Sequence, residues 1–373
     1  MTLAGTAWAR VERFPAGARH GGYRLDEAFA AEPTTWPLLT GDKALTQVSA
    51  EGAVFLDTET TGLSGGVGTF VWMVGLGRFL PGGGFEVWQA YLPGPEAEVP
   101  FLHAVAERIA AAGSVVSFFG RSYDQHRLLD RLRVHGLASP FDGRPHLDLF
   151  APLRRLVGDD LPNHRLQTLE RELCGHQRVD DLPGAAAPEA WFDSLAGRAH
   201  RMEGVFRHNL EDVLSLVTLF AASGRSLAGL RAGGEELAGC SEQRRLALAR
   251  AALERRAPGQ AAGLAASEPP SREDLRWRWL ALRSLGLARS GQVTAARELL
   301  EREGDLGEPS EEPAARDAVE AALLRARLAL RASEEGQAAA ALSRARARLE
   351  RAGERVRGLE RRLADLERRL GAR

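Results

Sequence analysis

A short apolar run that ends in two carboxylates constrains this chain more than any other segment. Residues 53–63 read Ala-Val-Phe-Leu-Asp-Thr-Glu-Thr-Thr-Gly-Leu, and the first four have the character of a buried strand. Side chains alternate along a strand, so Asp57 and Glu59 project from the same face. Paired carboxylates repel each other unless a cation lies between them, and oxygen ligands of this kind suit Mg²⁺ or Mn²⁺. A solvated strand end with turn-forming threonines is the alternative for an Asp-x-Glu pair taken alone.

The segments after this run alternate between strand and helix patterns. β-Branched and aromatic residues mark further strands, and apolar residues at helical spacing mark amphipathic helices. The predicted strands are 53–56, 69–76, 85–92 and 114–119, and the predicted helices are 99–112, 124–135, 147–156, 166–173 and 204–222. This order predicts an α/β domain with a mixed sheet and flanking helices rather than a regularly alternating parallel sheet.

The length of 373 residues suits two or three domains. Residues 1–50 are interrupted by prolines and glycines, and we expect an irregular lead-in there with a helix near residues 25–31. We place the α/β domain at residues 51–224. Residues 240–373 form a predicted helical region, because Ala, Arg, Leu and Glu recur there with helical periodicity.

The helical region contains two stretches that each fit a pair of helices. Residues 275–303 and 313–352 both show a helix, a turn at Gly291 or Gly336 respectively, and a second helix. The arrangement resembles tetratricopeptide-like helical hairpins.

The end of the chain has a coiled-coil pattern and a local positive charge. Residues 349–370 place apolar side chains at a and d spacing over about three heptads. Residues 341–373 hold 11 arginines and five acidic residues, a balance of +6. This charge suits either the polar face of a self-pairing helix or an attraction to a phosphate backbone. We therefore expect self-association or a protein partner at these helices.

Bulk composition excludes several classes of protein. The net charge is −1, so any surface that attracts nucleic acid must be local. Cys174 and Cys240 provide neither a disulfide framework nor a zinc ligand set, which suits a reducing cytoplasm. We find no signal peptide, and no apolar run reaches the roughly 18 to 20 residues of a membrane span. The composition predicts a cytoplasmic protein without a membrane segment.

The whole run at residues 53–63 resembles the first exonuclease motif of the DnaQ-like, or DEDD, 3′-to-5′ exonucleases, which have a ribonuclease H-like fold. The resemblance implies a second carboxylate after a later strand and a third on a C-terminal helix. The second is Asp124, which follows the string Phe-Phe-Gly-Arg-Ser-Tyr, and the third is Asp212. Asp124 taken alone fits a helix N-cap equally well.

The resemblance implies four metal ligands, namely Asp57, Glu59, Asp124 and Asp212, around two Mg²⁺ or Mn²⁺ ions. Such an ion pair activates an attacking water and stabilises the leaving oxygen of a phosphodiester. His208 lies one helical turn before Asp212 and is the candidate general base, with a plain surface histidine as the alternative. Three residues separate His208 from Asp212, whereas the histidine branch of these exonucleases has four and the tyrosine branch three. The identity of the base therefore stays open.

Further strings narrow the resemblance to the bacterial YprB-type ribonuclease H-like domain proteins, predicted exonucleases that often carry helical repeats. These strings are 61–69, 146–149, 165–172, 181–184 and 208–216. The resemblance covers about residues 50–222. It implies metal-dependent hydrolysis of single-stranded DNA or RNA ends, in the 3′-to-5′ direction.

Several positions near these motifs are candidates for contact with the substrate. Thr58 lies between two metal ligands. Gly65 and Gly66 follow the metal strand, where backbone can approach a terminal nucleotide closely, although a flexible turn explains them equally well. Arg121 and Arg165 are candidates for phosphate contacts, with solvated arginines as the alternative.

Two readings compete with an exonuclease. One is a non-catalytic ribonuclease H-like module that binds nucleic acid, and the other is a scaffold whose helical region binds partners. The presence of all four expected carboxylates favours the enzyme. Asp148 follows an apolar run and fits either an acid that orients a ligand or the start of a helix.

Overall fold

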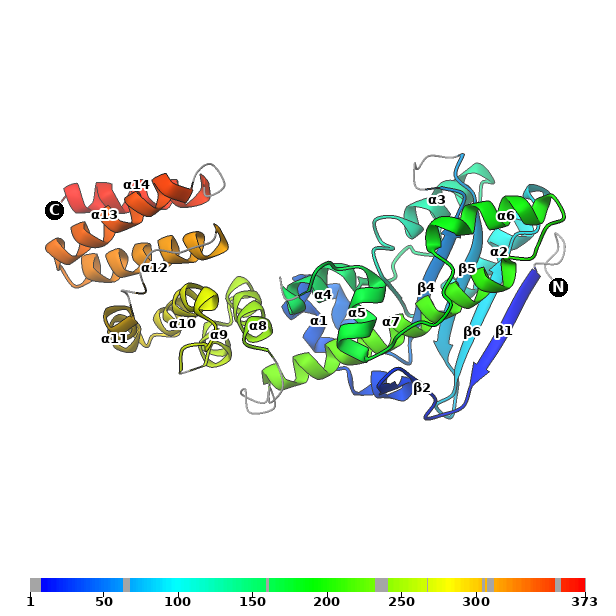
Figure 1. The fold of residues 1–373 in the computed structure, drawn as a ribbon, viewed down its shortest axis with the longest axis horizontal. Coiled ribbons are helices and arrows are strands. Elements are labelled where there is room, and N and C mark those ends of the chain that lie inside the picture. The colour runs from blue at the N-terminus through cyan, green and yellow to red at the C-terminus, as the bar shows by residue number, and fades with distance from the viewer. Residues whose placement is uncertain are drawn as a thin grey trace. The chain divides into compact units, whose positions relative to one another are not determined.

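The computed structural model describes residues 8–62, 68–158, 161–231, 241–266, 268–303, 306, 312–352 and 357–372. The chain divides into two compact units, Met1–Arg154 with Leu161–Ala228, and Arg155–Asp160 with Gly229–Arg373. The first unit contains a sheet flanked by helices, and the second is built from helices (Figure 1). The predicted fold class, an α/β domain followed by an all-α region, is confirmed.

A six-stranded sheet organises the first unit, in the order β1-β6-β5-β4-β7-β8. The first four strands of that order are antiparallel neighbours, whereas β7 and β8 run parallel to β4. The strands are β1 (Trp8–Phe14), β4 (Ala53–Thr60), β5 (Val71–Phe79), β6 (Phe85–Tyr91), β7 (Ser114–Ser117) and β8 (His146–Asp148). The carboxyl ends of the parallel strands therefore lie at one edge of the sheet, where sites in α/β folds commonly form.

Strand β4 extends beyond the apolar run that predicted it. It continues to Thr60, so Asp57 and Glu59 lie within the strand, where they pair with Gly75 and Met73 of β5. Strands β5 and β6 form the predicted hairpin.

Two strands of the sheet were not predicted from the sequence. β1 lies in the segment expected to be an irregular lead-in, and it pairs with β6 at the edge of the sheet. Most of its residues are exposed, so it carries little of the apolar alternation that marks a strand. β8 is three residues long, too short for a periodic pattern.

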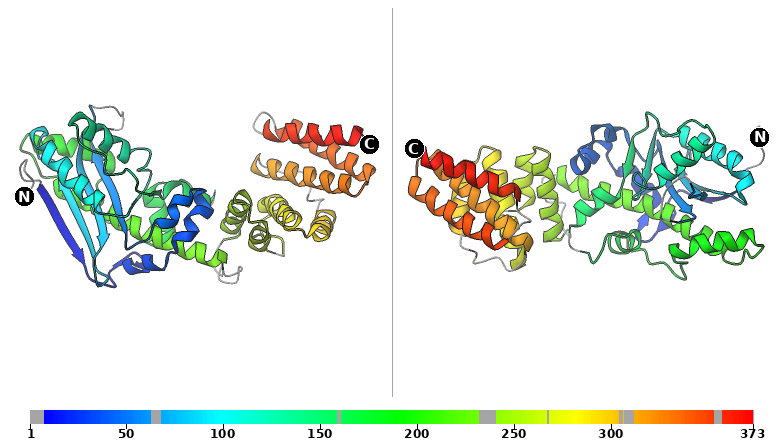
Figure 2. Two further views of the ribbon diagram at one scale, coloured as in Figure 1. Left: turned by 180° about the vertical axis from the view of Figure 1, so that it is seen from behind. Right: turned by 90° about the horizontal axis from the view of Figure 1, so that it is seen from above.

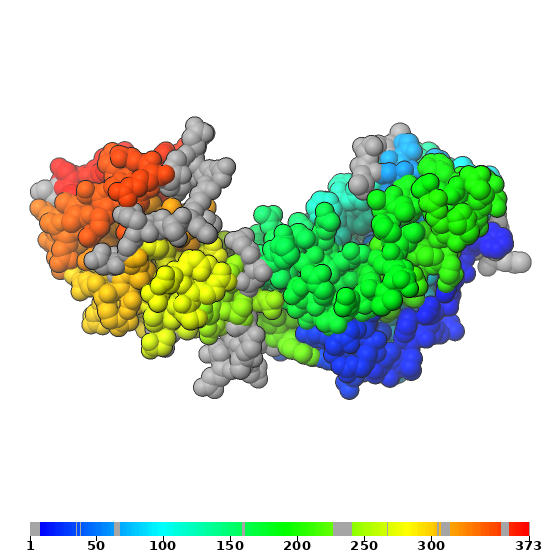
Figure 3. Space-filling model, in the orientation of Figure 1, coloured from blue at the N-terminus to red at the C-terminus, as the bar shows by residue number. Residues whose placement is uncertain are grey.

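Helices cover both faces of the sheet (Figure 2). On one face lie α2 (Glu98–Ala110) and α3 (Asp124–Val134), and on the other lies the long helix α7 (Met202–Arg231). The other strands and α-helices of this part of the chain are β2 (Arg19–His20), β3 (Tyr23–Arg24), α1 (Trp36–Thr40), α4 (Phe150–Val157), α5 (Leu166–Cys174) and α6 (Ala187–Leu195), and short 3-10 helices lie between some of the elements. In the space-filling view the helices of this half (green) cover one face of the unit, beside the N-terminal segment (dark blue) (Figure 3).

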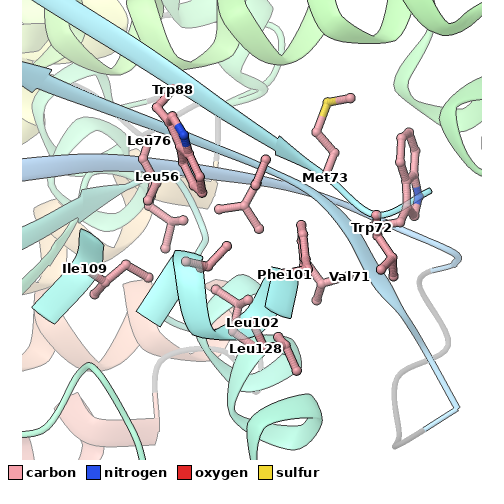
Figure 4. Close-up of a cluster of buried hydrophobic side chains, with 14 of the residues drawn as sticks. Leu56, Val71, Trp72, Met73, Leu76, Trp88, Phe101, Leu102, Ile109 and Leu128 are labelled. Carbon is pink, nitrogen blue, oxygen red and sulfur yellow. The ribbon is translucent and has the colours of Figure 1, made fainter. Parts of the chain in front are cut away.

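The two faces of β4 have separate cores. Leu56 belongs to a buried cluster with Leu102 of α2 and Leu128 of α3 (Figure 4). Phe55 points to the other face and packs edge-on against Phe220 of α7, with ring centroids 5.8 Å apart. Because both faces of β4 are buried, the strand holds its end, and the two carboxylates there, firmly in place.

The second unit is built from α-helices. They are α8 (Glu242–Glu254), α9 (Pro258–Leu264), α10 (Arg276–Arg289), α11 (Val293–Glu303), α12 (Glu312–Arg331), α13 (Glu335–Ala352) and α14 (Arg357–Gly371). Gly291 forms the predicted turn between α10 and α11 with a positive φ. The second turn differs from the prediction, because Gly336 lies inside α13 and Ser333 adopts the left-handed conformation instead.

The heptad pattern of residues 349–370 is divided between two helices. Leu349 lies on α13, whereas Leu359, Leu363 and Leu366 lie on α14, and all four are buried in one cluster with α12. The leucine stripe is therefore used within this chain. Arg346 of α13 pairs with Glu367 of α14 at 2.6 Å, as expected for helices that fold back on each other. Among the described residues, no helix combines the length and the apolar composition needed to cross a membrane.

Candidate active site

Two carboxylates of β4 begin the site. Alternation along the strand sends Asp57 and Glu59 to the face that α7 covers, the same face as Phe55. Glu59 is buried, and Asp57 is partly buried. The β4–β5 register shifts just after Glu59, and such irregularities often lie beside functional sites, where they re-aim side chains.

A side-chain amide from α7 holds Asp57. Asn209 donates from Nδ2 to Oδ2 of Asp57 at 2.8 Å, and its Oδ1 accepts from Gln89 Nε2 at 2.9 Å. Gly75 lies beneath this amide, and a Cβ at that position would overlap it. The absence of a side chain at Gly75 therefore allows Asn209 of α7 to reach Asp57.

Asp124 reaches the site from the start of α3. Thr58 points to the sheet face opposite Asp57, and its hydroxyl donates to Oδ1 of Asp124. Asp124 is the first helical residue, and the N-cap position belongs to Tyr123, so the N-cap alternative does not apply. A Cβ on Gly120 would lie 2.6 Å from Oδ2 of Asp124, which leaves room only for glycine.

Asp212 projects from α7 and carries an ion pair with Arg178. Arg178 donates from Nη2 to Oδ1 of Asp212 at 2.5 Å, and Nε2 of His208 lies 3.4 Å from Oδ2. Arg178 is itself anchored by Glu170 of α5, through Nε to Oε1 at 2.7 Å and Nη2 to Oε2 at 2.8 Å. The Arg178 and Glu170 side chains are only 6% and 1% exposed. A buried guanidinium therefore balances part of the negative charge at this end of the sheet.

His208 is oriented by a second carboxylate. Its Nδ1 lies 2.8 Å from Oδ1 of Asp181. Because a carboxylate only accepts hydrogen bonds, Nδ1 carries the hydrogen in this pair. Nε2 is then the nitrogen left to take up a proton, and it faces Asp212. A proton taken up by the neutral His208 ring would therefore bind at Nε2.

Burial raises the pKa of each predicted metal ligand, and repulsion from other predicted ligands adds to it for Asp57, Glu59 and Asp124. Burial is the largest cause for Asp57 and Glu59, and repulsion from Asp212 and Asp124 adds to it for both. The pKa of Asp124 rises from 3.8 to about 7 through burial, with repulsion from Asp148 and Asp212. The pKa of Asp212 is raised by burial, against the opposing effect of Arg178. All four predicted ligands are therefore acids whose charged form is disfavoured where they lie.

The raised pKa of Asp124 predicts how the stability of the metal-free protein depends on pH. The folded chain binds this proton more tightly than the unfolded chain, so the stabilisation is complete below about pH 4 and is lost as pH rises through about 7. In EDTA, we expect the melting temperature of the wild type to fall over this window. Asp124→Asn should show a smaller fall in thermal scans, and superimposable profiles would contradict the assignment.

The donor set is of the kind that a hard divalent cation prefers, because it consists of buried carboxylate oxygens. Within the described part of the chain, however, no three of these four carboxylates bring one oxygen each within 4.8 Å of the others. Asp124 is turned toward Thr58 and Asp212 toward Arg178. Binding of a shared cation therefore requires these side chains to rotate away from their present donors.

Within the described residues, His20, His176 and Glu211 do bring one possible ligand atom each within 4.8 Å of one another. The two imidazole rings stack, with centroids 3.7 Å apart and planes at 29°. Stacked rings direct their in-plane nitrogen lone pairs nearly parallel rather than onto one ion. His176 bonds Glu211 at 2.5 Å and His20 bonds Ser215 at 2.9 Å. We assign this group to packing of β2 against α7.

The predicted substrate contacts are only partly accounted for. Thr58 is engaged with Asp124. Arg121 is exposed and lies 3.8 Å from Asp42, and Arg165 is exposed at the start of α5. Gly65 and Gly66 lie outside the described residues.

Four residues of the site were missed as functional positions in the sequence. They are Asn209, Asp181, Arg178 and Glu170. Asn209, Asp181 and Glu170 stand inside strings that carried the family resemblance, which is a signal that could have found them. No local pattern marks Arg178, because its two shortest ion pairs join it to residues 8 and 34 positions away along the chain.

Comparisons with known proteins find two similarities. A family model described as RNase_H superfamily matches residues 54–223, a range that contains all four carboxylates and His208. The chain is also 32% identical over 217 residues to a protein of Bacillus subtilis (strain 168) named "Uncharacterized protein YprB". The matched region is 57% of this chain and 51% of that relative, so the chain spans about half the relative's length.

Proposed function

We propose that this chain is a metal-dependent 3′-to-5′ exonuclease of single-stranded DNA or RNA, of the ribonuclease H superfamily whose model matches residues 54–223 and similar to the YprB relative. What supports the proposal is the presence of four buried carboxylates near the end of β4, Asp57, Glu59, Asp124 and Asp212, each with a pKa that burial raises. An oriented histidine lies beside them. A folding core gains nothing from such a concentration of buried negative charge, whereas a divalent-cation site requires it.

Each residue of the site has a role in the proposed reaction. Asp57, Glu59, Asp124 and Asp212 would hold the Mg²⁺ or Mn²⁺ ions, which would supply charge stabilisation and an acidified water. His208 takes the proton of the attacking water at Nε2. The water oxygen bonds to phosphorus, the bond from phosphorus to the departing nucleoside oxygen breaks, and that oxygen takes a proton from solvent. We place this activity in the cytoplasm, on nucleic-acid ends.

The direct test is hydrolysis of single-stranded oligonucleotides labelled at the 5′ end, as DNA and as RNA, with Mg²⁺ or Mn²⁺. We expect a ladder of products that shortens from the 3′ end, and no products in EDTA. Release of the label as a mononucleotide at the earliest times would contradict the polarity. Binding without hydrolysis under all of these conditions would instead identify a non-catalytic nucleic-acid-binding module.

His208 and Asp181 are expected to affect the chemical step rather than binding. His208→Gln should lower kcat by about 10²- to 10⁴-fold, the usual contribution of a general base. Asp181→Asn should lower kcat less, because it disturbs only the orientation of His208. KM should change little in both variants. Steady-state kinetics on a single-stranded oligonucleotide provides the check, and a rise in KM with unchanged kcat would assign both residues to substrate binding instead.

A further inference from the structure

An exposed aromatic residue with an unusual backbone lies next to the proposed metal ligands. Phe119 follows strand β7 and has a φ of +60°, in the left-handed region that bulky residues rarely adopt. Its side chain is 50% exposed. A strained backbone and a water-exposed apolar ring both reduce the stability of the fold. Strained backbone positions cluster at functional sites.

Asp148 holds the backbone of Phe119 in this conformation. Oδ1 of Asp148 accepts from the Phe119 amide at 2.8 Å, and Oδ2 accepts from the Arg121 amide at 3.1 Å. Oδ1 also accepts from the Phe150 amide at 3.0 Å. Three backbone amides thus converge on one carboxylate at the end of β8. This accounts for Asp148, which starts a helix and also fixes the loop after β7.

The same loop touches the carboxylate site. Gly120, the residue after Phe119, lies against Oδ2 of Asp124, where a Cβ would be 2.6 Å away. Asp148 also raises the pKa of Asp124 by charge repulsion. The ring of Phe150 packs edge to face with Phe119, at a centroid distance of 5.2 Å and an angle of 81°. Phe119 is therefore a supported aromatic ring at the rim of the site.

We propose that Phe119 is a platform on which a base of the single-stranded substrate stacks as the chain end enters the site. This inference rests on the proposed nuclease function and names a substrate contact for it. Every nucleobase has a π-face, so stacking on a phenylalanine is tolerant of sequence. A base inside a duplex has both faces covered by its neighbours, so only a base at or near a chain end can stack on the ring. Asp148 is the positioning residue that keeps the ring at the rim.

The test uses Phe119→Gly, because glycine adopts a positive φ without strain and the fold should persist. The substrates are single-stranded DNA oligonucleotides with Mn²⁺, either intact or with an abasic residue at one of the last three 3′ positions. For intact oligonucleotides, Phe119→Gly should raise KM by roughly fivefold to 150-fold. At the abasic position that faces the ring, wild type and variant should have equal KM. Phe119→Trp should keep or lower the wild-type KM.

Phe29→Ala is the matched control, because Phe29 is also an exposed aromatic residue. It packs on Phe79 at the end of β5, whereas Glu59 pairs with Met73 near the start of that strand. It should leave KM unchanged. If the wild type degrades the intact oligonucleotide and Phe119→Gly does so with the same KM, the stacking role is wrong and the nuclease proposal stands. If the penalty of Phe119→Gly is the same for every abasic substrate, Phe119 acts on the loop rather than on a base. If the wild type degrades no oligonucleotide, both proposals fall together.

Discussion

Replacement of Asp57 by asparagine is expected to lower the rate of oligonucleotide hydrolysis by at least about 10³-fold, the scale seen when one member of a catalytic unit is removed. Asp57 interacts with each of the other three predicted ligands, because repulsion from Asp212, from Asp124 and from Glu59 contributes to its raised pKa. Asparagine has nearly the same shape, and its side-chain oxygen can still accept the hydrogen bond from Asn209. The substitution therefore removes a metal ligand and leaves the packing of β4 intact.

The rate loss should be accompanied by weaker binding of metal and by an unchanged fold. Titration calorimetry with Mn²⁺ should show reduced affinity, and the melting temperature in EDTA should be equal to that of the wild type or higher, because one buried charge is gone. Asp142→Asn is the matched control, since Asp142 is an exposed acid in the turn before β8. A rate within tenfold of wild type for Asp57→Asn would remove the carboxylate cluster from the reaction.

The carboxylates could be predicted from the sequence, whereas the groups that hold them could not. Asp57 and Glu59 come directly after an apolar run, and this local pattern can be recognised from the sequence without knowledge of the fold. Their partners are set by tertiary contacts. Asn209 meets Asp57 across 152 residues of sequence, and that contact depends on the absence of a side chain at Gly75. A motif shows which groups carry the chemistry, but not which donors neutralise them.

The same limit applies to the edges of the fold. β1 is an edge strand whose pairing with β6 comes from backbone hydrogen bonds rather than from buried side chains, so its sequence carries little strand signal. The heptads around Leu359 and Leu363 correctly mark an apolar helix face, but period alone does not distinguish a partner chain from the neighbouring helices α12 and α13, which cover that face.

Arg178→Ala is expected to destabilise the first unit by about 3–5 kcal/mol, the cost of leaving a buried charge without its partner. The substitution would leave Glu170, whose side chain is 1% exposed, without its cationic partner. Asp212 would also lose the guanidinium that opposes its raised pKa. Arg178→Met with Glu170→Gln removes both charges, and the side-chain oxygen of the introduced glutamine can still accept from the hydroxyl of Ser215. This pair should recover much of the loss, because replacement of both partners of a buried ion pair is often nearly neutral.

The ion pair between Arg178 and Asp212 also competes with metal, because the guanidinium occupies an oxygen that a cation would need. Mn²⁺ should therefore raise the melting temperature of Arg178→Ala by more than that of the wild type, since a ligand stabilises according to its affinity for the folded state. Arg201→Ala is the control, because it breaks a 2.8 Å pair with Glu189 at the surface of the same unit. It should change neither the calorimetric transition nor its response to Mn²⁺. An equal Mn²⁺-induced rise in the melting temperature of Arg178→Ala and of the wild type would contradict this competition. Asp212 would then either bind metal without displacing Arg178 or not bind metal at all. The Asp212→Asn variant would separate these two outcomes.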